Sequence, residues 1–418
     1  MRLLAVALLV VACNRAPDRQ PDAGTEVPQK TVRDSYGPAA HVLLSANFAL
    51  KWGDEGQVAP QHAQALLDGL EQAWAAEIDH LGYPVPTGCD VSRMNVYIGS
   101  TGAGTPAAYA GYAFASHDPD GTPSLVYSTQ RVADVRKAIN SAAHEFFHTI
   151  QFSIGTLAGD EASWWWEATA TWMAEEVFPD TFDAGYLYAI GSYALLPHLS
   201  LRHNEPPQSE WQLVQGHQYG AWIFARDLTE HHGDATLLRR SFVDAGSEPD
   251  VLRVIERLLA ERGTSVVDAF GTFAARNTIW DYANGARYRD AVAEMAADYP
   301  EQDHRFVADV PPAGVPLGPA PAATLPEHAG YNVIRMRAAP AGDLTIRFRA
   351  TSTAAFRVTA VIDGSAPRTI AMPIAGGQGE VTLQGLAGGE RVFLTVAAWS
   401  WASAPGEVFA YDYGFIPL

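Results

Sequence analysis

The chain has 418 residues, of which 48% are hydrophobic and 18% are charged, and its formal net charge at pH 7 is −19. This length and apolar fraction allow one large domain or two to three ordinary ones, each with ample core. The acidic balance argues against nucleic acid as a partner, because binding to phosphate needs basic patches. It fits a soluble exported protein.

The amino terminus has the features of a bacterial export signal. Arg2 is followed by an apolar run at residues 3–12 and then by Cys13. The run is too short to span a bilayer, and a positive charge ahead of such a run is typical of a signal peptide. The sequence VVAC at residues 10–13 resembles the lipobox of bacterial lipoproteins. This implies a signal peptide over residues 1–13, lipidation at Cys13 and a place in the cell envelope, at the outer membrane. The alternative is an ordinary signal peptide and a secreted product.

The polar stretch at residues 14–38 is rich in Pro and Asp. Such a composition predicts a disordered tether, so the protein would touch the membrane only through its N-terminal lipid anchor. Cys13 and Cys89 are the two cysteines of the chain. If Cys13 carries lipid, Cys89 has no partner, which excludes a disulfide scaffold and predicts a buried thiol.

The region before the most informative motif alternates between strand and helix patterns. The expected elements are a strand at 41–52, a helix at 60–81, a strand at 94–99, and a hairpin-like pair of strands at 109–115 and 124–128. An Asp-Gly turn at residues 118–121 separates the last two runs.

Residues 141–151 follow helical periodicity and contain His144-Glu145-x-x-His148. Residues four apart on a helix point about 40° from one another, so both imidazoles lie on one face. Two neutral imidazole nitrogens at this spacing can share one Zn²⁺. Glu145 can flank a water on that ion and take its proton. The alternative is a pair of ordinary histidines on a buried helix.

A catalytic zinc needs three protein ligands and an open position for water. A third histidine in the pattern His-Glu-x-x-His-x-x-Gly-x-x-His is excluded, because Gln151 and Ile154 stand at the corresponding positions. Glu167 lies nineteen residues after His148 and is followed by good helix formers. A second, antiparallel helix could therefore bring Glu167 to the metal. We expect one catalytic Zn²⁺ ion.

The segments HEFFHTIQ (144–151) and WWWEATATWMAEE (164–176) resemble those of the gluzincin metallopeptidases, the thermolysin-like and aminopeptidase-like group. More closely, they look like secreted bacterial metalloproteases of the myxobacterial type. The resemblance covers roughly residues 95–230 and is strong at these two segments. It implies a two-lobed zincin catalytic domain over residues 39–310, with a mixed-sheet upper lobe and a helical lower lobe.

By this resemblance, His144, His148 and Glu167 are the zinc ligands and Glu145 is the general base. Gluzincins often place an Asp four residues after the ligand Glu to orient a metal-bound histidine. The corresponding residue here is Thr171, whose hydroxyl could make a hydrogen bond of this kind.

The resemblance also implies residues that contact the substrate. In gluzincins the strand bordering the cleft pairs with an extended substrate. By position this strand is residues 111–115, so Gly111, Tyr112 and Ala113 are the expected substrate-binding residues. The alternative is that they only pack the sheet.

Residues 183–299 have mostly helical patterns and would form the lower lobe. The candidate helices are 184–196, 217–231, 235–245, 249–262, 266–275 and 287–297. In aminopeptidase-like gluzincins, a Tyr near the start of such a helix donates a hydrogen bond to the oxyanion. Tyr219 matches this placement approximately, and His217 is the neighbouring alternative. Packing is the competing interpretation for either residue.

The C-terminal part changes pattern after a Pro- and Ala-rich stretch at residues 311–324, which predicts a domain linker. Seven short alternating runs follow within residues 325–418 and predict an antiparallel β-sandwich. It resembles the accessory β-domains of secreted peptidases. The expected fold class is therefore α+β.

Together these features favour a zinc-dependent metallopeptidase acting on a peptide or protein substrate. Residues 109–115 contain no acidic residue, and the Gly-x-Met-Glu-Asn motif of aminopeptidases is absent. We therefore expect a gluzincin-like zinc metalloendopeptidase. The alternative is an inactive surface lipoprotein that serves as a binding or adhesion module through its β-sandwich. Retention of Glu145 argues against that alternative.

Overall fold

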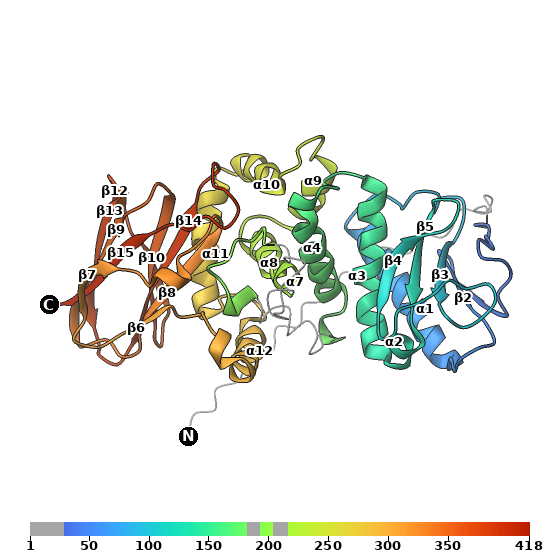
Figure 1. Cartoon of the computed structure of the whole chain (residues 1–418), viewed down its shortest axis with the longest axis horizontal. Helices are drawn as coiled ribbons and strands as arrows, with labels where there is room; N and C mark the ends of the chain where they lie inside the picture. Colours follow the sequence, from blue (N-terminus) through green and yellow to red (C-terminus); the bar gives the residue numbers. More distant parts are fainter. Residues whose placement is uncertain (1–28, 182–192, 204–215) are drawn as a thin grey trace, which may run out of the picture.

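The computed structural model describes residues 29–181, 193–203 and 216–418. The expected signal peptide with Cys13, residues 14–28 of the expected tether, and most of the helix expected at 184–196 lie outside the described residues. The described part combines helices with three five-stranded sheets, so the fold is mixed α and β (Figure 1). Within it, no helix combines the length and apolarity needed to cross a membrane.

The first sheet is mixed. Its strands are β1 (His41–Leu44), β2 (Phe48–Trp52), β3 (Met94–Ile98), β4 (Ala113–His117) and β5 (Pro123–Tyr127), in the spatial order β1-β2-β3-β5-β4. Strands β2, β3 and β5 are parallel, whereas β1 and β4 run antiparallel to their neighbours at the two edges. The single strand expected at 41–52 is a hairpin, because the backbone N–H of Ser45 donates to the carbonyl of Phe48 (3.0 Å) and closes a turn.

Two helices pack on this sheet. Helix α1 (Pro60–Trp74) continues as a π-helix over Ala75–His80, and the short α2 (Thr129–Ala133) leads into α3 (Val135–Ile154). Phe146 of α3 packs against Trp74 of α1 and Phe48 of β2, with ring centroids 5.5 and 5.4 Å away. Helix α3 ends at Gly155, whose φ of 70° suits glycine.

Helix α4 (Ser163–Val177) follows α3 after a short loop and packs along it (Figure 1). The later helices agree closely with the expected ranges. They are α7 (His217–Gly220), α8 (Trp222–His231), α9 (Ala235–Val243), α10 (Val251–Ala260), α11 (Val266–Ile279) and α12 (Gly285–Asp298).

The C-terminal strands form two sheets around a second hydrophobic core. The strands are β6 (Ala308–Val310), β7 (Val315–Pro319), β8 (Gly330–Met336), β9 (Gly342–Ala350), β10 (Ala355–Asp363), β11 (Arg368–Ala371), β12 (Ile374–Ala375), β13 (Gln378–Leu386), β14 (Arg391–Trp399) and β15 (Tyr411–Pro417). The sheet orders are β11-β10-β14-β8-β6 and β12-β13-β9-β15-β7. All pairings given for these sheets are antiparallel except β6 with β8. The expected antiparallel strands are thus present.

The expected linker at residues 311–324 needs correction. It contains β7, which pairs with β15 and so belongs to the second of the C-terminal sheets. The other sheet packs on the helices, because Tyr331 and Phe393 share one buried cluster with Phe270 of α11. At Gly330 a Cβ atom would lie 2.3 Å from the carbonyl oxygen of His198. The C-terminal strands are therefore docked on the helices rather than held by a free linker.

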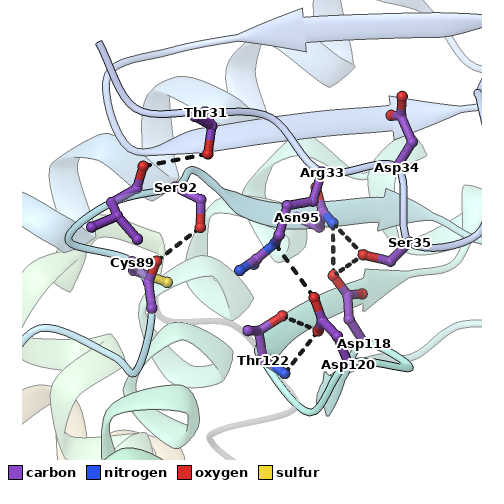
Figure 2. Close-up of polar contacts among 12 residues, drawn as sticks. Thr31, Arg33, Asp34, Ser35, Cys89, Ser92, Asn95, Asp118, Asp120 and Thr122 are labelled. Atoms are coloured by element: carbon purple, nitrogen blue, oxygen red, sulfur yellow. Dashed lines mark hydrogen bonds and ion pairs between the residues drawn. The ribbon is translucent and has the colours of Figure 1, made fainter. Parts of the chain in front are cut away.

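The end of the expected tether also needs correction, because residues 29–38 lie against the first sheet (Figure 2). Asp118 is buried and accepts hydrogen bonds from Ser35 Oγ (2.8 Å) and Asn95 Nδ2 (2.6 Å). The backbone N–H of Thr31 donates to the carbonyl of Val91 (3.1 Å). These contacts hold the segment in place, so the folded part begins before residue 39.

Candidate metal centre

Helices α3 and α4 bring two imidazoles and one carboxylate together. The Nε2 atoms of His144 and His148 are 3.1 Å apart. Glu167 Oε2, from α4, is 3.3 Å from Nε2 of His144 and 3.5 Å from Nε2 of His148. The two histidine side chains are only 7% and 11% exposed, whereas that of Glu167 is 25% exposed. Three potential ligand atoms therefore form a nearly equilateral triangle that is open on one side.

The size of this triangle fits one tetrahedral zinc ion. With metal–ligand bonds of about 2.0–2.1 Å, two ligands of a tetrahedron lie about 3.3–3.4 Å apart. The three observed separations bracket this value. Two imidazole nitrogens and one carboxylate oxygen are also a donor set used by catalytic zinc. The residues present therefore fit a zinc ion with three protein ligands.

Gln151 orients one of the two histidines. Its Oε1 atom lies 2.6 Å from Nδ1 of His148 and can accept a hydrogen bond from it, which turns Nε2 toward the other two ligand atoms. The amide group of Gln151 is held in turn, because its Nε2 donates to the carbonyl of Trp166 (3.2 Å) and to Oγ1 of Thr169 (3.1 Å). Gln151 is fully buried.

Glu145 points toward the edge strand rather than into the triangle. Its Oε2 accepts a hydrogen bond of 3.1 Å from the backbone N–H of Ala115 on β4. A carboxylate oxygen of Glu145 still lies within 4.8 Å of ligand nitrogens of both His144 and His148. Burial raises the pKa of Glu145, although the neighbouring imidazoles oppose that shift. This placement allows Glu145 to exchange a proton with a water between it and the triangle.

Glu167 and His148 each shift the pKa of the other. Burial alone would raise the pKa of Glu167, but the charge of His148 and hydrogen bonds from both histidines hold it well below its usual range. Burial alone would lower the pKa of His148, yet the carboxylate of Glu167 raises it to about 9. Glu167 is thus an anion over the physiological range, as a zinc ligand must be.

A cavity of about 620 Å³ opens onto this centre. Beyond the ligands and Glu145, its walls are mainly apolar, with Phe152 and Trp166 on one side and β4 on another. Tyr219 lines the cavity, and its ring centroid lies 6.2 Å from that of His144. Neither Lys nor Arg is among the described residues lining it.

The other residues expected at the site have different positions. Among the expected substrate-binding residues, Ala113 lines the cavity, whereas Gly111 and Tyr112 lie in the turn before β4. Tyr112 is 65% exposed. His217 is fully buried, outside the lining of the cavity, and its Nε2 donates to the carbonyl of Ser200 (3.1 Å). Of the two candidate oxyanion donors, Tyr219 alone therefore faces the centre.

Thr171 does not orient a histidine. Its side chain is fully buried, and its hydroxyl has no hydrogen-bond partner among the described residues. The orienting residue missed from the sequence is Gln151, which had served only to exclude a third histidine ligand. Its spacing of three residues from His148 places the two side chains on adjacent positions of one helix face, and this was the available signal.

Comparisons with known proteins identify a family but no activity. Residues 39–359 match the model described as "Family of unknown function (DUF6055)". None of the curated proteins matches the chain. A solved structure with some likeness is "A novel family GH115 4-O-Methyl-alpha-glucuronidase, BtGH115A, with specificity for decorated arabinogalactans", at 9% sequence identity and a TM-score of 0.16. The likeness covers 69% of this chain and 39% of that chain, so this chain spans about two fifths of its length. A TM-score this low carries no argument about fold or activity.

Two expectations drawn from the resemblance are wrong. The family model that matches the chain describes a family of unknown function and is not a gluzincin model. Membership of the gluzincins, and with it the class of gluzincin-like zinc metalloendopeptidase, is therefore withdrawn. The resemblance rested on two short segments, whereas the family model spans about three quarters of the chain. The chain belongs to the DUF6055 family, a family of unknown function.

Proposed function

We propose that the protein is a zinc-dependent hydrolase that cleaves peptide bonds with a water molecule activated by Glu145. The observation that carries this proposal is the triangle of His144 Nε2, His148 Nε2 and Glu167 Oε2, with sides of 3.1, 3.3 and 3.5 Å. A structural ion pair would not need both imidazole nitrogens turned toward each other. A cation bound by both nitrogens would account for that arrangement.

The residues around the triangle have complementary roles. A zinc ion held there would lower the pKa of water toward about 7 and polarise a carbonyl group. Glu145, fixed by the N–H of Ala115, takes a proton from the attacking water and passes it to the leaving nitrogen. Its raised pKa favours this exchange of protons. Tyr219 would donate a hydrogen bond to the oxygen on which negative charge develops.

The substrate class follows from the strand beside the cavity. Within the described chain β4 pairs only with β5, so it is an edge of its sheet. An extended peptide could add to this edge as a further strand and present its carbonyl to the centre. The apolar walls formed by Phe152 and Trp166 would accept a side chain of that peptide. We also propose that the first sheet with its helices and the helices from α4 onward form the two lobes of a zincin-type catalytic unit.

The test replaces Glu145 with Gln, which keeps the size of the side chain but removes its basicity. The variant should keep stoichiometric zinc and lose hydrolysis of a peptide substrate by about 10²–10⁴-fold, the usual contribution of a general base. Glu161→Gln is the matched control, because Glu161 is an exposed carboxylate in the 3-10 helix Asp160–Ala162 before α4, and it should keep full activity. Undiminished hydrolysis by the Glu145→Gln variant would remove the proposal.

Measurements on the purified wild-type chain distinguish this proposal from the competing function. If the wild-type chain binds zinc tightly but turns over no protein or peptide substrate, the alternative of an inactive exported binding module is favoured. If it neither holds zinc in stoichiometric amount nor loses activity to a chelator, the metal site itself is wrong. Export as a lipoprotein anchored through Cys13 is a separate proposal and does not depend on either result.

A further inference from the structure

A second cavity, of about 360 Å³, is lined by residues of α11, α12, β8 and β14, among others. Its position follows from the alternation of side chains along β8. Ile334 and Met336 face the core between the two C-terminal sheets, whereas Val333 and Arg335 face the helices. The cavity is thus formed by the helical region and the C-terminal strands together, and it shares no lining residue with the cavity at the metal centre.

Five arginines line this cavity: Arg289, Arg305, Arg335, Arg337 and Arg391. The whole chain has only 28 Lys and Arg residues and a formal net charge of −19. Asp363 is the acidic residue among the described residues of the lining. A concentration of cations at one point of an acidic protein attracts small anions.

The innermost guanidinium groups are held rigidly by carboxylates outside the lining. Arg335 donates from Nε and Nη2 to the two oxygens of Asp309 (2.6 and 3.1 Å). Arg305 donates in the same way to Asp303 (2.8 and 2.8 Å). No described residue accepts a hydrogen bond from Nη1 of either arginine. Each therefore keeps a donor group for a ligand, already fixed in orientation.

Aromatic packing fixes the same region further. The guanidinium carbon of Arg335 lies 3.9 Å from the ring centroid of Phe306. Phe306 in turn stacks on Phe393, with centroids 5.8 Å apart and an interplanar angle of 24°. The donors are therefore ordered before a ligand binds, so binding would lose little side-chain conformational entropy.

Among the described residues, the ion pairs of these arginines leave one positive charge unbalanced. Asp309 forms ion pairs with both Arg335 and Arg337, since Nη2 of Arg337 is 2.8 Å from Oδ2 of Asp309. Arg391 pairs with Asp363, and the one described partner of Arg289 is the exposed Asp290, at 3.9 Å. Five guanidinium groups thus face four carboxylates: Asp290, Asp303, Asp309 and Asp363. A ligand with a single anionic group would balance this charge.

We propose that this cavity binds a small organic anion, whose carboxylate or phosphate group contacts the arginines and whose apolar body lies against the aromatic wall. Arginine donates two parallel hydrogen bonds to both kinds of oxyanion, so both share the required chemistry. The volume suits a molecule at the small end of the usual range for binding sites. This site is independent of the proposed hydrolase function.

The test titrates the purified chain with benzoate and with phenyl phosphate by calorimetry, and with neutral benzamide as the uncharged analogue. At least one of the two anions should bind saturably with a millimolar or tighter Kd, and benzamide should not. The titration is repeated after chelation of metal, because an oxyanion could also bind at the metal centre. Binding that survives chelation belongs to the second cavity. The stronger of the two anions identifies carboxylate or phosphate as the preferred group.

Variants then locate the binding. Arg305→Gln and Arg335→Gln, which remove the Nη1 donors, should each weaken binding at least about tenfold in a chain that remains folded, as expected for a lost charge-assisted hydrogen bond. Arg347→Gln is the control, because this exposed arginine pairs with Glu380 on the other C-terminal sheet, and it should bind like the wild type. Absence of saturable binding by either anion to the folded wild-type chain overturns the proposal. Binding unchanged in both folded variants does so too.

Discussion

Replacing Gln151 with Ala removes the acceptor that holds His148 with its Nε2 toward the proposed metal. The bond that is lost is short (2.6 Å) and lies in a fully buried position. Loss of such an orienting partner weakens metal binding by about 10–100-fold, which is about 1.4–2.8 kcal/mol. We therefore expect the zinc Kd of Gln151→Ala, measured by competition with a chromogenic chelator, to rise by this factor.

The same variant should also lose stability, for a separate reason. The carbonyl of Trp166 loses the amide of Gln151 as a donor but still accepts from Oγ1 of Thr169 (3.3 Å). Nδ1 of His148, in contrast, loses its buried acceptor. One unsatisfied buried polar group costs about 1–3 kcal/mol in unfolding free energy. A melting curve recorded without metal measures this loss and keeps it apart from the change in zinc affinity.

Two further variants distinguish orientation from general damage. Gln151→Glu keeps an acceptor for His148 and should bind zinc more tightly than Gln151→Ala. Asn140→Ala removes another buried amide of α3, which donates to Oγ1 of Thr181 (3.1 Å), and should change stability but not zinc affinity. A folded Gln151→Ala chain with the zinc Kd of the wild type would refute the role assigned to Gln151.

Three other outcomes are expected. Glu167→Gln should lower the zinc content measured by atomic emission, because a neutral amide replaces the anionic ligand; full occupancy in that variant would contradict the triangle. Burial lowers the pKa of His217 and of His328 to about 3 and that of His198 to about 4. Between these values and the ordinary pKa of about 6.5 the unfolded chain binds more protons, so stability should fall as the pH drops through this window; a melting temperature that stays constant from pH 7 to pH 4 would argue otherwise. Cys13→Ser should abolish incorporation of labelled fatty acid, and labelling that persists would exclude Cys13 as the lipidation site.

The elements that depend on short-range pattern were predictable from the sequence. The spacing of His144, Glu145 and His148 within one helix determines their relative directions, because an α-helix repeats every 3.6 residues. The helices and strands agree closely with their periodic patterns for the same reason. The approach of Glu167 to the two histidines was also expected, since a short loop between two packed helices leaves few other arrangements.

Other features depended on contacts between distant parts of the chain. Tyr219 and His217 are two residues apart, and only packing against Ser200 and α3 determines which of them faces the cavity. The family, too, could not be judged from two short motifs.

The sequence by itself thus determined the helix pair and the three side chains that can share a metal. The tertiary structure alone decided that Gln151 turns its amide oxygen to His148, because the donors that orient this amide are anchored to a different helix. The tertiary structure also places Arg289 and Arg391, about a hundred residues apart in the sequence, in the lining of one cavity. Periodicity reports the direction of a side chain relative to its own element, whereas a binding site depends on how elements pack against one another.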